Sequence, residues 1–169
     1  MSRTVFVLGT DHRYQTRDTF FAETQHEAFV QFVAETCRAH GIRAIAEEIN
    51  TQALAEASVE ESVPQRIAHT LGLPHQYSDP DRATRMRLGI WQQNDIRARA
   101  FLHSWAEPVL QEKLQASDRA RERYWLEQII VLNVWPVLFI CGADHSMSLI
   151  SLLSEFNLQS QLVARDWGS

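Results

Sequence analysis

The sequence has few cysteines and no long apolar run, and both shortages restrict the class of protein. The longest apolar run, residues 134–142, is too short to cross a bilayer. The first nine residues hold only four consecutive apolar side chains, fewer than a secretory signal needs. Cys37 and Cys141 are the only two thiols. We therefore expect a soluble, reduced, cytoplasmic protein without a membrane anchor.

An excess of positive charge is also missing. The formal net charge is −5, so we expect neither nucleic acid nor anionic lipid as a partner. Arginine supplies every basic residue except Lys113, which is typical of a coding-composition bias. The sequence contains no P-loop, no Gly-x-Gly-x-x-Gly fingerprint and no Gly-x-Ser-x-Gly elbow. These absences argue against a P-loop nucleotide site, a dinucleotide site and a serine hydrolase of the elbow type.

Strand and helix patterns alternate along the chain. Apolar periodicity predicts strands over residues 3–9, 42–49, 73–78, 135–141 and 158–164. Helical patterns lie between them, and one such helix is expected to begin at Ser117 or Asp118. This alternation predicts a three-layer α/β/α fold with a mainly parallel, Rossmann-like sheet. The 169 residues suit a single α/β domain, residues 1–169.

Polar side chains follow the predicted strands at their carboxyl ends, where parallel sheets bind ligands. The first and fourth strands end in the same spacing, Gly9-Thr10-Asp11-His12 and Gly142-Ala143-Asp144-His145. The second strand ends at Glu47-Glu48. The two glycines permit a positive φ or a close approach of backbone to a ligand. Two imidazoles and one carboxylate suit a Zn, Mn, Fe or Co ion that activates water.

Successive strand residues face opposite sides of a sheet, so only one of Glu47 and Glu48 is expected in the crevice. The other then acts as a general base or orients a histidine, a task that also suits Asp11 or Asp144. Simpler interpretations remain for these residues. His12 is also compatible with an ordinary loop residue, and Asp144 is also compatible with the N-cap of a helix. The roles of His75, Asp79 and the arginines between 82 and 99 stay open, a solvated helix face being the simplest interpretation of the arginines.

The paired Gly-x-x-His segments, with an acidic strand end between them, resemble the TraB/TIKI group of the erythromycin-esterase/ChaN-like superfamily. Residues 137–145 and the helix and strand after them are the part most similar to the family pattern. The family's Glu-Leu-Asp strand end is similar to Glu48-Ile49-Asn50, which favours Glu48 as the principal carboxylate. Its Glu-Arg-Asn helix motif is similar to Glu122-Arg123-Tyr124, which implies that Arg123 contacts substrate or an oxyanion.

The sequence and the resemblance together predict a metal-dependent hydrolase of amide, ester or phosphoester bonds in a small molecule or peptide. His12, Glu48 and His145 are expected to hold the divalent ion, with Glu47 or Asp144 as base or support. Arg123 is expected to stabilise developing negative charge. The alternatives are a non-catalytic carrier of haem or another small ligand, and a regulatory protein on the same fold.

Overall fold

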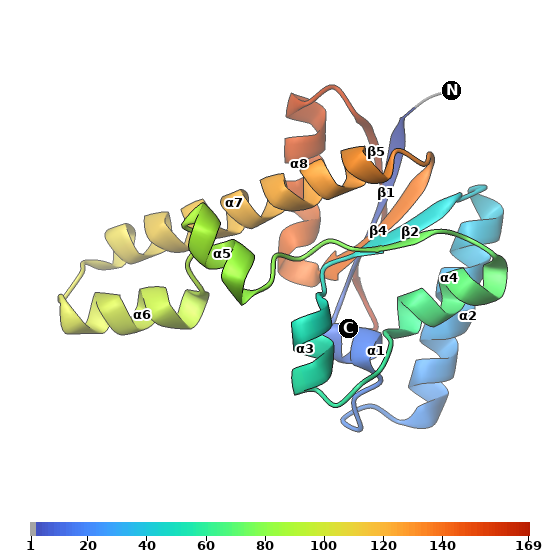
Figure 1. Ribbon diagram of the computed structural model, residues 1–169, viewed down its shortest axis with the longest axis horizontal. Coiled ribbons are helices and arrows are strands. Elements are labelled where there is room, and N and C mark those ends of the chain that lie inside the picture. Colours follow the sequence, from blue (N-terminus) through green and yellow to red (C-terminus); the bar gives the residue numbers. More distant parts are fainter. Residues whose placement is uncertain (1–2) are drawn as a thin grey trace.

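The computed structural model describes residues 3–169, and its centre is a five-stranded sheet (Figure 1). The strand order is β3-β2-β4-β1-β5, and every neighbouring pair is parallel. The strands are β1 (Thr4–Thr10), β2 (Ala44–Glu47), β3 (His75–Tyr77), β4 (Val137–Gly142) and β5 (Gln159–Trp167). The predicted α/β class is confirmed. Residues 1 and 2 of the predicted domain lie outside the described residues.

Helices connect these strands. They are α1 (His12–Thr16), α2 (Glu23–Ala39), α3 (Thr51–Glu56), α4 (Val63–Leu71), α5 (Arg82–Leu88), α6 (Gln93–Leu102), α7 (Glu107–Leu132) and α8 (Ser146–Glu155), with a short 3-10 helix η1 (Ala143–His145). The predicted helix start at Ser117 or Asp118 is wrong, because α7 is continuous from Glu107. The Ser117 hydroxyl donates to the carbonyl of Trp91 instead of capping a helix.

Alternate residues of each strand build two separate apolar layers. Val5, Val7 and Phe139 pack with α7 and α8 on one face of the sheet. Phe6 and Leu8 point to the other face, where α1, α2 and α4 cover them. This period of two produces the three predicted layers, since both faces of a parallel sheet must be buried.

The strand ends and the long helix set the position of the functional side chains. β1, β2 and β4 run in the same direction, so α1, α3 and η1 all start at one edge of the sheet. α5, α6 and the first half of α7 extend away from the sheet as an arm (Figure 1). Within residues 3–169 no helix combines the length and the apolar character needed to cross a membrane.

Replacing Phe139 tests the central position of β4. Phe139 is fully buried on the α7 face, so Phe139→Ala should lower the free energy of unfolding by about 3–5 kcal/mol. Phe101 on α6 is 86% exposed, and Phe101→Ala should change it by less than about 0.5 kcal/mol. Urea denaturation of both variants measures the difference. Equal losses would contradict this packing.

Candidate functional site

A cleft of about 520 Å³ opens at the carboxyl ends of β1, β2 and β4. His12 borders it from the start of α1, Glu48 from the end of β2, and His145 from the end of η1. Asp144 also lines the cleft and is exposed. The structure therefore brings together four of the six residues that the sequence predicts for the site.

The carboxylate of Glu48 lies at the centre of this cleft and is 4% exposed. Its Oε2 accepts a hydrogen bond from the main-chain amide of Gly142 at 2.8 Å, and its Oε1 pairs with Arg121 Nη2 at 2.6 Å. Both imidazoles approach the same carboxylate. His12 Nε2 lies 3.5 Å from Oε2, and His145 Nε2 lies 3.8 Å from Oε1. Three segments distant in sequence thus converge on one buried anion.

Gly142 is required for space rather than for an unusual backbone angle. Its φ is −58°, so the positive φ considered from the sequence does not occur. A Cβ at this position would lie 2.7 Å from His12 Nε2 and 3.4 Å from Glu48 Oε2. Gly9 has the same role in β1, since a Cβ there would lie 2.0 Å from the carbonyl oxygen of Arg165. Both glycines therefore permit close packing at the strand ends.

His145 is held from two sides. Its Nδ1 lies 3.0 Å from Oε1 of Glu122, a carboxylate that also accepts a hydrogen bond from Ser148. Trp125 packs against the ring edge-to-face at 5.0 Å between centroids. Burial lowers the pKa of His145, but the hydrogen bond to Glu122 and the charge of Glu48 outweigh burial, so the pKa is raised. The ring is thus fixed with Nε2 directed toward Glu48.

Glu47 lies on the opposite side of the sheet from the cleft and is fully buried. This difference follows from the strand alternation, which sends neighbouring side chains to opposite faces. Its carboxylate accepts hydrogen bonds from Gln15 and Ser62, and His75 Nε2 lies 2.8 Å from Oε1. Glu47 therefore does not reach the cleft as a general base. His75, whose role the sequence left open, is a neighbour of this buried carboxylate.

Arg123 is exposed and does not line the cleft; Arg121, two residues earlier on α7, does. Two residues rotate the side-chain direction by about 200° on a helix, so these arginines point to opposite sides. Arg121 is therefore the arginine of this pair that borders the cleft. The sequence analysis also did not predict Glu122 as a site residue. Glu122 lies on the buried face of α7 with Trp125 and Ile129, where a charged side chain is unusual.

Asp79 fixes Arg121 in place. Its Oδ1 accepts from Arg121 Nη2 at 2.8 Å and from Trp125 Nε1 at 3.0 Å. Its Oδ2 accepts from Arg85 Nη2 at 2.5 Å and from Asn50 Nδ2 at 3.2 Å. Burial raises the pKa of Asp79, but the two guanidinium groups outweigh it and the pKa is lowered. The carboxylate is therefore an ionised anchor beneath the cleft.

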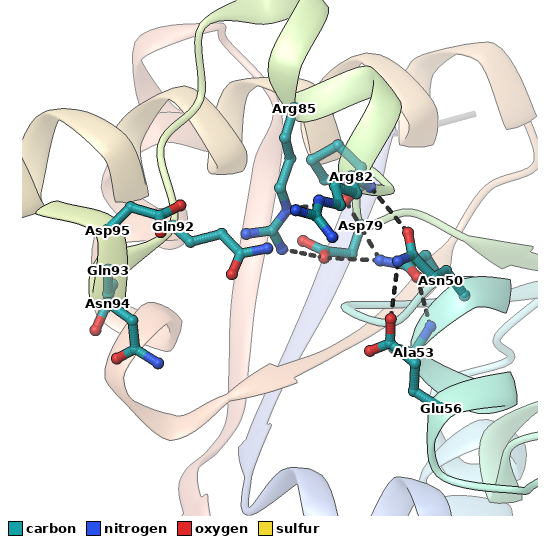
Figure 2. Close-up of a pocket in the computed structure, with 12 residues that line it drawn as sticks. Asn50, Ala53, Glu56, Asp79, Arg82, Arg85, Gln92, Gln93, Asn94 and Asp95 are labelled. Atoms are coloured by element: carbon teal, nitrogen blue, oxygen red, sulfur yellow. Dashed lines mark hydrogen bonds and ion pairs between the residues drawn. The ribbon is translucent and has the colours of Figure 1, made fainter.

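A second hollow of about 540 Å³ adjoins the cleft, and Gln93 borders both. Figure 2 shows Gln92 on the α6 side, Asn50 and Glu56 on the α3 side, and the arginines of α5 above them. Polar side chains line most of it. Arg85 is fixed by Asp79 and by the carbonyl of Pro80, whereas the Arg82 side chain is exposed.

The predicted metal ligands His12, Glu48 and His145 lie close together in the cleft, and Glu48 also pairs with Arg121. Two ligands that each lie about 2.0 Å from one tetrahedral ion are about 3.3 Å apart, so the 3.5 Å pair of His12 and Glu48 is compatible with sharing an ion. Arg121, however, places a positive guanidinium on the same carboxylate. Within residues 3–169 no group of three His, Cys, Asp or Glu side chains is arranged to hold a metal ion. In this arrangement the donors do not fit a divalent cation.

Comparison with known proteins adds no assignment. No protein-family model, curated protein or solved structure matches the chain. Membership of the TraB/TIKI group therefore stays a prediction that is based on the short motifs alone.

The variant Asp79→Asn tests the buried anchor. Removing the charge leaves Arg85 and Arg121 without a full partner, and the free energy of unfolding at pH 7 should fall by about 3 kcal/mol. Because the pKa of Asp79 is lowered on folding, its contribution is complete above the unfolded pKa of about 3.9 and is lost as pH falls through the folded pKa. Wild type and variant should therefore converge in acid.

Urea denaturation between pH 2 and pH 7 measures this convergence. Asp95→Asn on α6 is the control, since Asp95 is exposed. A stability difference between wild type and Asp79→Asn that does not change with pH would argue against an ionised anchor.

Proposed function

We propose that the protein is a hydrolase that cleaves an ester, amide or phosphoester bond with water activated at His12. The observation that supports this function is the pair of imidazoles on either side of Glu48. Each ring has its Nδ1 held by a side-chain oxygen, Gln15 for His12 and Glu122 for His145, and its Nε2 near the carboxylate. Two oriented imidazoles in an open polar cleft are suited to moving protons to and from a substrate.

His12 is the base in this proposal. Its side chain is 50% exposed, which gives Nε2 access to water and substrate in the cleft. Removing a proton from a water molecule generates the hydroxide that attacks the carbonyl carbon or phosphorus. Glu48 Oε2 lies 3.5 Å from this nitrogen, so the carboxylate stands next to the atom that receives the proton.

Arg121 and His145 act on the charge that develops as the bond breaks. Arg121 uses Nε and Nη2 for Asp79 and Glu48, and among the described contacts its Nη1 has no partner. This remaining donor is available for an oxyanion, as preorganised donors in hydrolase sites are. His145, held by Glu122, gives a proton to the leaving group through Nε2. Asp144 lies at the rim, and among the contacts of residues 3–169 none links it to Glu48 or to either imidazole, so we assign it no proton transfer.

A metal-assisted form of the same hydrolase is the second candidate, because the 3.5 Å approach of His12 to Glu48 suits two ligands of one ion. It requires Arg121 to leave Glu48, and the ion would then be held by His12, Glu48 and His145. A divalent ion held there would supply Lewis acidity.

Replacing each imidazole tests the first candidate, the hydrolase that works without a metal ion. His12→Ala and His145→Ala should each lower kcat/KM by about 10²- to 10⁴-fold, the range for loss of a general acid or base. His69→Ala on α4 is the control, because His69 is exposed and distant from the cleft residues. A panel of small esters, amides and phosphoesters supplies the assay. Full activity in both cleft variants would overturn the proposal, and no turnover of any substrate by wild type would favour a binding protein.

Metal removal separates the two forms. For the metal-free form, wild-type activity should be unchanged after dialysis against a chelator, and elemental analysis should find less than about 0.1 ion per chain. Loss of activity that returns with Zn, Mn, Fe or Co would establish the metal-assisted form. In that case His12→Ala and His145→Ala should each abolish the bound metal, whereas His69→Ala should keep it.

A further inference from the structure

We infer that Glu47 and Gln15, two buried residues outside the cleft, hold His12 in the tautomer that carries its proton on Nδ1. The contacts form a chain across the sheet: His12 Nδ1 lies 2.7 Å from Gln15 Oε1, and Gln15 Nε2 donates to Glu47 Oε2 at 2.7 Å. The consequence for catalysis rests on the proposed function, whereas the tautomer itself does not.

The chain has only one consistent direction because Glu47 is a carboxylate. An ionised carboxylate accepts hydrogen bonds and donates none. The Gln15 amide must therefore turn its NH₂ group toward Glu47. The reverse orientation would place two acceptor oxygens 2.7 Å apart in a fully buried position, which is strongly unfavourable.

The orientation of Gln15 then decides the proton on His12. With its NH₂ group on Glu47, Gln15 presents its carbonyl oxygen to Nδ1, and an oxygen acceptor requires an N–H donor there. In a neutral imidazole the other nitrogen, Nε2, consequently carries a lone pair. This is the nitrogen that lies 3.5 Å from Glu48 in the cleft. Glu47 therefore acts on the site through Gln15, as a positioning residue.

The surroundings keep this chain rigid. Gln15 and Glu47 are both 0% exposed. The Ser62 hydroxyl, which caps α4, donates to Oε1 of Glu47, and His75 Nε2 lies 2.8 Å from the same oxygen. These contacts come from α4 and β3, so two elements outside the cleft fix the carboxylate that orients Gln15. His12 itself is half exposed, and in the described structure its Nδ1 has no other partner.

The test is ¹⁵N NMR of the histidine rings in the full-length protein, at a pH where His12 is neutral. In wild type, His12 should show a protonated Nδ1 and an unprotonated Nε2. Gln15→Leu removes the acceptor, so His12 should show a mixture of both tautomers. Gln31→Leu, the same change at an exposed position of α2, should leave the His12 signals as in wild type.

Kinetics supply a second measurement on any ester or amide that wild type cleaves. Gln15→Leu should lower kcat/KM by about 10- to 100-fold, typical of residues that orient an active-site histidine. The pH profile of kcat/KM should also shift, which a purely structural role would not cause. If Gln15→Leu does not fold, Glu47→Gln replaces it: an amide at position 47 also accepts the reverse orientation of Gln15, so the mixture of tautomers should appear again.

The outcomes separate the two proposals. A wild-type His12 with its proton on Nε2 would overturn the inference, whatever the activity. A proton on Nδ1 that is unaffected by both Gln15→Leu and Glu47→Gln would also overturn it, because the tautomer would then have another cause. The expected tautomer in a protein that cleaves no substrate would support the inference and reject the hydrolase.

Discussion

The burial of one carboxylate, Glu48, is the constraint on which the arrangement of this edge of the sheet depends. An ionised carboxylate with 4% exposure is stable only where donors and positive charge replace its water. The donors come from Gly142 in β4 and from Arg121 in α7. Arg121 in turn requires Asp79, which follows β3, and Asp79 requires Arg85 from α5. A single buried charge therefore fixes the relative positions of β2, β4, α5 and α7.

The periodicities of strand β2 and helix α7 give neighbouring residues at the cleft different partners. On the strand, the period of two separates Glu48 in the cleft from Glu47 beneath the opposite face. On α7, consecutive residues lie about 100° apart, so Arg121 and Glu122 take different partners. Arg121 binds Glu48, and Glu122 binds His145. Glu47 and Glu122, the chain neighbours of Glu48 and Arg121, do not line the cleft, but each is linked to a cleft imidazole, Glu47 through Gln15 and Glu122 directly.

The sequence alone was sufficient to predict the α/β fold and the edge of the sheet where the polar residues gather. Strand patterns and the two Gly-x-x-His segments depend only on the order of neighbouring residues, which a single sequence displays. Arg121 and Gln15 were not predicted, because their importance depends on contacts with residues far away in the sequence. Gln15 meets Glu47, 32 positions later, and Arg121 meets Glu48 across 73 positions. The motif similarity pointed to Arg123, but only the rotation of α7 shows which arginine enters the cleft.

The donor at Gly142 has a consequence for how the cleft can change. This hydrogen bond to Glu48 comes from the peptide group, so a different side chain at that position alters the space around the carboxylate but leaves the donor itself in the chain. Insertion or deletion of one residue within β4 has a larger effect, since it exchanges the two faces of the strand and moves Phe139 out of its layer. Variation at this edge is therefore restricted in length along β4 and in residue type at Gly9 and Gly142.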